Sequence, residues 1–293
     1  EHAITMPKDQ HSLLHHVREL NAWNPENFVP FHVSGQRAGY LKPFMCRQLR
    51  RWPRFFKVEN DRVELAKDLG FHERNRILEE VVRELVADGV IAHYLGEVYP
   101  LTAQCRNQPL ALLDRGAAGY FGIRTYGQHL NGYVSSEQGI RLWLARRADS
   151  RIHFPGRLDN MVAGGLPQGL SLKTNLRKEC REEADIPGEQ VEQAVSVGAV
   201  SYCCETEIGL KPDTLFCYDL ELPADFQPRN TDGEVSEFML VGLQEVLHLV
   251  RDTDAFKPNC NLVILDFLLR HGVIDPEEPE YLQLVEELHA KVF

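Results

Sequence analysis

Apolar residues recur at helical spacing toward both ends of the chain. Within 74–88, Ile77, Val81 and Leu85 fall on one face, and Gly89 follows where a helix would end. Such a stripe predicts a helix that packs against a core. Spacing and bounding turn residues predict further helices, some of them short, at 11–23, 41–49, 111–115, 244–250, 261–271 and 281–291.

Strand patterns dominate the middle of the chain. Residues 128–134 and 140–147 alternate between apolar and polar, and the polar turn 135–139 joins them, which predicts a β-hairpin. Further strands are expected at 98–101, 194–202, 213–220 and 238–241. Helices and strands mixed in this way predict an α/β or α+β fold.

The change of pattern near Ala118 divides the chain. With 293 residues, the protein is long enough for two domains. We expect an N-terminal domain at 1–118, a second domain at 119–255, and C-terminal helices at 256–293 that pack on the second domain.

Charge and cysteine content exclude several classes of protein. The formal net charge of −11 argues against a non-specific nucleic-acid or anionic-membrane binder, because both need a basic surface. A small anionic substrate stays compatible with it, because a bound cation can reverse the local charge. The seven cysteines show no repeated Cys-x-x-Cys spacing, and no apolar run is long enough to span a bilayer. We therefore expect a cytoplasmic protein with reduced thiols.

Three glutamates gather on one face of a predicted helix that follows a glycine-rich turn. In a helix from Thr174 onward, Glu182 lies about 60° to one side of Glu179 and Glu183 about 40° to the other. Neighbouring like charges destabilise a helix unless solvent or a cation screens them, and such carboxylates suit Mg²⁺ or Mn²⁺. A solvated charged face is the alternative interpretation.

The glycines and glutamates together resemble a Nudix box. That pattern reads Gly, five residues, Glu, seven residues, Arg-Glu, an aliphatic residue, any residue, Glu-Glu, any residue, Gly and an aliphatic residue. With Gly164 as its first glycine, the three glutamates fall on box positions and Ile186 on the last. Three positions depart from the pattern: Leu170 replaces its first glutamate, Lys178 its arginine and Asp185 its second glycine.

The resemblance extends along most of the chain. Residues 126–134, 143–147 and 155–165 look like the Nudix branch related to the domain fused to thiamine pyrophosphokinase in some fungi. This resemblance implies a Nudix α/β/α sandwich with a mixed sheet, preceded by a smaller α+β leader domain. It also implies metal-dependent hydrolysis of thiamine diphosphate, or preferentially its oxidised analogues, to the monophosphate and phosphate.

The resemblance assigns the metal site to the box. It implies Glu179, Glu182 and Glu183 as ligands of Mg²⁺ or Mn²⁺, with a backbone carbonyl from Gly164. A further carboxylate often comes from a loop before a later strand. Glu237 fits that place and Glu234 is the second choice, either of them as ligand or general base.

Leu170 raises a separate question. The family's glutamate at this position supports the loop and helix and pairs with the box arginine. Because Leu170 and Lys178 depart together, we expect an apolar contact in place of a polar one and retained activity.

Substrate recognition needs aromatic faces and cations for the diphosphate. A structural role is the alternative for each candidate, above all a core role for His129 and Trp143. The candidates are Arg157, His129, Asn131, Tyr133, Arg146 and Lys257, with Arg147, Trp143 and Tyr202 beside them.

Three functions fit these observations. They are the thiamine-linked hydrolase, a Nudix enzyme acting on ADP-ribose, a nucleotide or an isoprenoid diphosphate, and a Nudix fold that binds a ligand without cleaving it. The leader domain either shapes the pocket or mediates a homodimer.

Overall fold

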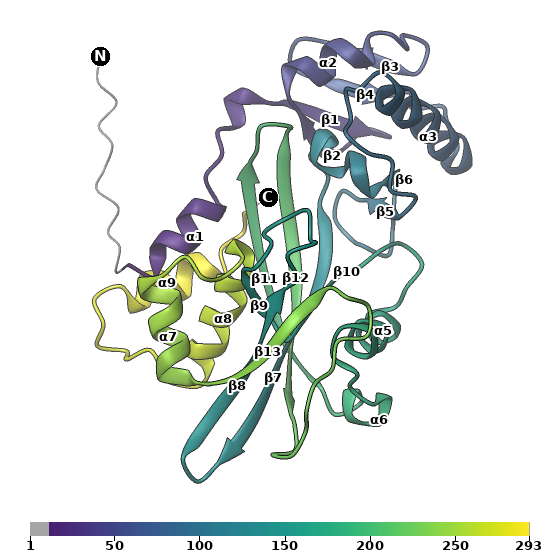
Figure 1. Ribbon diagram of the computed structural model, residues 1–293. Helices are drawn as coiled ribbons and strands as arrows, with labels where there is room; N and C mark the ends of the chain where they lie inside the picture. The colour runs from purple at the N-terminus through teal and green to yellow at the C-terminus, as the bar shows by residue number, and fades with distance from the viewer. Residues whose placement is uncertain (1–11, 293) are drawn as a thin grey trace.

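The computed structural model describes residues 12–292, and a seven-stranded sheet lies at its centre (Figure 1). The main path runs β11-β12-β7-β8-β13, with β10 paired to β7 and β9 to β8. β12 and β7 are parallel and the other pairs are antiparallel, so the sheet is mixed, as expected. The strands are β7 (Thr125–Ser136), β8 (Gly139–Arg147), β9 (Leu158–Asn160), β10 (Val162–Gly165), β11 (Val195–Glu205), β12 (Leu210–Glu221) and β13 (Val235–Gly242).

Helices cover both faces of this sheet. Alternate residues of β7 point to opposite sides, so Leu130 packs toward α5 while Tyr133 packs against the C-terminal helices. Figure 1 shows α5 and α6 on one side of the sheet and α7, α8 and α9 on the other. The result is the expected α/β/α sandwich. Its helices are α5 (Leu172–Ala184), α6 (Gly188–Val191), α7 (Leu243–Asp252), α8 (Pro258–Arg270) and α9 (Tyr281–Leu288).

The leader domain has its own sheet and core. Its four strands run in the order β2-β1-β4-β3, and a separate hairpin pairs β5 with β6. Helix α3 packs Ile77, Val81 and Leu85 into the core that Phe31 and Phe121 also enter. Its elements are η1 (Pro25–Asn27), β1 (Val29–Val33), β2 (Gln36–Leu41), α2 (Pro43–Leu49), β3 (Phe56–Val58), β4 (Val63–Leu65), α3 (Phe71–Ala87), β5 (Val98–Leu101), β6 (Ala111–Asp114), η2 (Arg115–Ala117) and α4 (Ala118–Phe121).

The helix predicted at 111–115 is wrong. Residues Ala111–Asp114 form β6, which pairs with β5 from Val98↔Asp114 to Leu101↔Ala111. The segment is too short to form a stable helix alone, and its backbone groups find partners in β5. The four-stranded sheet of the leader domain and the short strands β9 and β10 were not predicted at all.

Helix α1 (Leu14–Leu20) lies near the start of the chain but packs with the C-terminal helices. Leu14 and Val17 enter the same core as the C-terminal helices instead of the leader core. The predicted helix 11–23 is longer than α1, and residue 11 lies outside the described residues. Among residues 12–292, no helix combines the length and apolarity that crossing a bilayer requires.

Candidate active site

Helix α5 presents the glutamates because its opposite face is anchored in the core. Ser171 caps its first turn by accepting a hydrogen bond from the Thr174 amide at 3.0 Å. Leu176 and Cys180 are buried against the sheet. This packing fixes how the helix is rotated and sets the direction of Glu179, Glu182 and Glu183.

Glu183 is a buried carboxyl group. Its Oε2 accepts a hydrogen bond from the Ala163 amide of β10 at 2.8 Å. The pKa of Glu183 is raised to about 8, mainly by burial; the Ala163 bond lowers it, and the nearby carboxylates of Asp159, Glu179 and Glu234 add to the rise. A carboxyl group held among other carboxylates in this way would be stabilised in its charged form by a cation.

Glu179 lies directly against Gly164. A Cβ on Gly164 would stand 2.3 Å from Glu179 Cδ and 2.6 Å from its Oε2, so this position has room only for glycine while Glu179 keeps its place. Burial raises the pKa of Glu179, an effect that Lys178 opposes and that Glu182 and Glu234 increase. The carbonyl oxygen of Gly164 lies over Gly127 of β7.

Glu182 is the most exposed of the three glutamates and shares a cation with Glu179. Lys178 Nζ lies 3.1 Å from Glu179 Oε1 and 2.9 Å from Glu182 Oε2. The residue at the box arginine position therefore bridges two of the carboxylates. The three glutamates form one cluster, and the donor set of carboxylate oxygens fits a hard divalent cation.

The two loop carboxylates lie in different places. Glu234 lines a small hollow together with Glu183, Asp159 and Ala163, and it forms an ion pair with Arg151. Glu237 is exposed, pairs with Arg146 at 3.1 Å, and lines a neighbouring cavity of about 290 Å³ together with Trp143 and Phe238. The structure thus brings Glu234, and not Glu237, to the glutamate cluster.

Comparisons with known proteins agree with this geometry. Residues 12–125 match the family described as "Domain of unknown function (DUF4743)", and residues 129–260 match the NUDIX domain. The chain is 41% identical over 274 residues to "Nudix hydrolase 20, chloroplastic" of Arabidopsis thaliana, an alignment covering 90% of this chain and 73% of that protein. This chain belongs to the Nudix hydrolase family.

Other relatives align over a similar length. "Nudix hydrolase 24, chloroplastic" of Arabidopsis thaliana is 40% identical over 89% of this chain and 72% of its own. "Uncharacterized protein YJR142W" of Saccharomyces cerevisiae is 33% identical over 88% and 82%. The solved structure of a MutT protein from Methanosarcina mazei covers 50% of this chain and 95% of its own at 19% identity, with a TM-score of 0.40. As a Nudix hydrolase, the protein acts on diphosphate bonds, and enzymes of this family generally use divalent metal ions.

Most substrate-binding candidates of this Nudix hydrolase are engaged within its core, on the face that α8 covers. Asn131 Nδ2 donates to Asp219 Oδ1 at 3.0 Å, and His129 Nδ1 lies 2.8 Å from Asn160 Oδ1. Tyr133 packs against the rings of Phe267 and His271, and the Tyr202 hydroxyl donates to Asp213 at 2.7 Å. Arg157 is exposed, and its side chain has no hydrogen bond or ion pair within residues 12–292.

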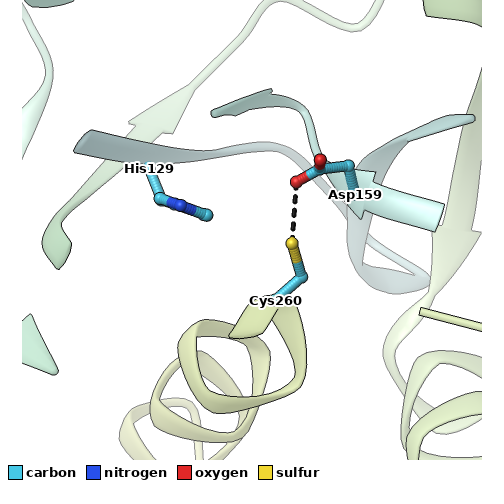
Figure 2. A group of neighbouring side chains, drawn as sticks. All are labelled: His129, Asp159 and Cys260. Carbon is cyan, nitrogen blue, oxygen red and sulfur yellow. Dashed lines mark hydrogen bonds between the residues drawn. The ribbon is translucent and has the colours of Figure 1, made fainter. Parts of the chain in front are cut away.

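Figure 2 shows His129, Asp159 and Cys260 as neighbouring side chains. All three are buried, and their potential ligand atoms lie within 4.8 Å of one another. The Cys260 thiol donates to Asp159 Oδ1 at 2.7 Å, and burial raises the pKa of Cys260 well above its ordinary value. Asp159 Oδ2 lies 2.9 Å from Arg147 and 3.4 Å from Lys257. Two cations beside this carboxylate would repel a metal ion, so the trio is a hydrogen-bonded core cluster.

Asp159 is the site residue that sequence reasoning missed. Burial alone would raise its pKa, but Lys257, His129, the Cys260 thiol and Arg147 together lower it, so it stays ionised beside Glu183. Asp159 lies in the stretch 155–165, which resembles the thiamine-linked Nudix branch. Nothing in its spacing indicates that the carboxylate would face the box helix across β9 and β10.

Proposed function

We propose that this Nudix hydrolase cleaves thiamine diphosphate and, preferentially, its oxidised analogues, releasing the monophosphate and inorganic phosphate. The observation that carries the hydrolytic part is the convergence of Glu179, Glu182 and buried Glu183 beside Gly164. The choice of substrate rests on the resemblance of 126–134, 143–147 and 155–165 to the thiamine-linked branch.

The three box glutamates are our candidates for holding Mg²⁺ or Mn²⁺. The raised pKa of Glu183 supports this, because the group lies buried among carboxylates that an added cation would neutralise. When bound, such a cation would neutralise diphosphate oxygens and lower the pKa of an attacking water. The Gly164 carbonyl is a weaker candidate, since it lies against β7.

Glu234 is our candidate for the loop carboxylate that serves as general base or further ligand. It shares the hollow with Glu183, whereas Glu237 is engaged by Arg146 outside that hollow. A general base must come within hydrogen-bond reach of the water it deprotonates, which favours the carboxylate inside the cluster. This reverses the preference that the sequence suggests.

Among the basic candidates, exposed Arg157 is the one we propose for the diphosphate. Lys257 and Arg147 both neutralise Asp159, and Arg146 pairs with Glu237. His129 and Asn131 support the site from the hydrogen-bonded core. Arg157→Ala should therefore raise KM for the diphosphate substrate and leave kcat close to that of the wild type.

A substrate panel tests this proposal. Phosphate release is measured with Mg²⁺ or Mn²⁺ from thiamine diphosphate, its oxidised analogues, ADP-ribose and a set of nucleotides. The highest kcat/KM on an oxidised thiamine compound would support the proposal. A higher kcat/KM on ADP-ribose or a nucleotide would show that the proposed substrate is wrong, while the assignment as a hydrolase would stand. Binding of a panel compound without turnover would favour a ligand-binding module.

A further inference from the structure

The leader domain fastens the loop that carries the first half of the Nudix box. Gly164 and Gly165 end β10, and the loop from Leu166 to Leu170 leads from there toward α5. The Arg106 guanidinium donates through Nη2 to the carbonyls of Pro167 at 3.1 Å and Leu170 at 2.7 Å. The Gln168 amide donates to the Val98 carbonyl of β5 at 2.8 Å.

A third leader residue, Tyr99, packs on Gly165 at the end of β10. A Cβ on Gly165 would stand 2.3 Å from the Tyr99 hydroxyl, so Tyr99 lies directly over that glycine. Gly165 is also tied to α5, because its carbonyl accepts a hydrogen bond from Asn175 at 2.9 Å. The loop is therefore held between the leader domain and the box helix.

The box lacks the glutamate–arginine pair that the family pattern has at positions 170 and 178. Leu170 cannot pair with residue 178, and Lys178 binds Glu179 and Glu182 instead. The expected apolar replacement is also missing, since half-buried Leu170 belongs to none of the hydrophobic clusters within residues 12–292. The polar contact that remains at this position is the one from Arg106 to the Leu170 carbonyl.

The Arg106 side chain is bound by backbone carbonyls and has no carboxylate partner in the described chain. Its Nε is buried without an acceptor. Burial lowers the pKa of Arg106. Removing a guanidinium group from water in exchange for two carbonyl bonds lowers the stability of the fold, which points to a role for the segment that those bonds hold.

We propose that Arg106 is a positioning residue that replaces the missing glutamate–arginine pair of the Nudix box. By holding the Pro167 and Leu170 carbonyls, it fixes residues 166–170, which join the end of β10 at Gly164 and Gly165 to the helix that carries Glu179. The expected effect on turnover rests on the proposed function; the effects on loop dynamics and metal affinity do not.

The test compares Arg106→Ala and the milder Arg106→Lys with the wild type. Arg62→Ala is the matched control, because Arg62 is a leader arginine with a buried Nε whose partner, Glu64, lies in the leader sheet. Three quantities are measured on the full chain: hydrogen exchange of the 165–170 amides, Mn²⁺ affinity by electron paramagnetic resonance, and kcat and KM separately.

We expect Arg106→Ala to speed exchange at 165–170 and weaken Mn²⁺ binding and kcat by about tenfold each, with KM little changed. Arg62→Ala should change none of the three. Adding Leu170→Glu and Lys178→Arg to Arg106→Ala restores the family's pair, and it should recover most of the lost Mn²⁺ affinity.

The proposal is wrong if Arg106→Ala has the same hydrogen exchange at 165–170 and the same Mn²⁺ affinity as the wild type. Equal losses in Arg62→Ala, or no recovery with the restored pair, would also overturn it. Should Arg106→Ala fail to fold, Arg106→Lys decides the question, because lysine keeps the charge but lacks the planar guanidinium group whose Nη2 reaches both carbonyls. Wild-type exchange and Mn²⁺ affinity in Arg106→Lys would then overturn the proposal. A wild type without turnover on the panel would count against the proposed substrate, and exchange and Mn²⁺ affinity would still decide the role of Arg106.

Discussion

Gly164 and Glu179 show how a single atom can shape this site. The Glu179 carboxyl group occupies the space that any side chain at 164 would take. Glycine is therefore required at this position because the Glu179 side chain approaches its Cα closely. From the sequence alone, a tight turn is the more obvious reason for a glycine.

Gly164→Ala should lower kcat/KM by about 100-fold, because the new methyl group displaces a metal-ligand candidate by an ångström or more. The free energy of unfolding should change by only about 1 kcal/mol or less, since the clash is with the end of a flexible side chain. Gly242→Ala is the control, as a Cβ there meets nothing within 4 Å. Equal activity of the two variants would contradict the assigned contact.

Glu183 should make the metal-free protein sensitive to pH. Its pKa is about 8 in the fold against a usual 4.5, so the unfolded chain ionises first as pH rises. The protonated Glu183 carboxyl group therefore contributes fully to the free energy of unfolding below about pH 4.5, and this contribution is lost as pH approaches 8.

Glu183→Gln, which cannot ionise, should therefore be more stable than the wild type in EDTA at pH 8, by roughly 3–5 kcal/mol. The difference should shrink toward pH 5. Urea unfolding across this range measures it. Parallel stability curves for the two proteins would show that the Glu183 carboxyl group is ionised freely in the fold.

At the scale of elements, helix α5 ends on a strained residue. Asp185 has φ of 52° and ψ of 36°, the left-handed conformation for which the family pattern has glycine. Its carboxylate pairs with the exposed side chains of Arg181 and Arg229, and such pairs contribute little stability.

Asp185→Gly and Asp185→Ala both lose these ion pairs, but only alanine keeps the strain. The glycine variant should therefore be more stable than the alanine variant by about 1–2 kcal/mol, measured by urea unfolding. Alanine equal to glycine would mean that the left-handed conformation costs nothing here.

Periodicity predicts elements well when their own side chains determine them. Helix α3 and the β7–β8 hairpin follow from their patterns, and only their ends shift. Residues 111–114 form a strand because β5 pairs with them, and β9 and β10 exist because neighbouring strands of the large sheet accept them. Partners far along the chain leave no local pattern, so these strands could not be predicted.

At the scale of the molecule, two domains build one site. The box motif predicts the glutamate cluster, and the resemblance predicts a leader domain. The contacts of Val98, Tyr99 and Arg106 with the box loop could not be predicted, because they join segments roughly 60 residues apart with no shared motif. The place of Asp159 beside Glu183 could not be predicted either, because the two residues lie on separate elements with no shared motif.

If the leader domain holds the box loop, the departure at Leu170 should be tolerated. Leu170→Glu should keep its dependence on divalent metal, and its kcat should stay within about threefold of the wild type. Initial rates at several Mn²⁺ concentrations measure both quantities. A gain much larger than this would mean that the native loop is poorly fastened and the native site impaired.

The most direct test of the central claim is phosphate release as a function of Mn²⁺ or Mg²⁺ concentration, in wild type, Glu182→Gln and Glu183→Gln. We expect wild-type turnover that EDTA abolishes. Each variant should lose about 100-fold or more, since even the partners of metal ligands cost 10–100-fold when removed. Metal-dependent turnover that survives unchanged in both variants would show that the box carboxylates do not carry the reaction.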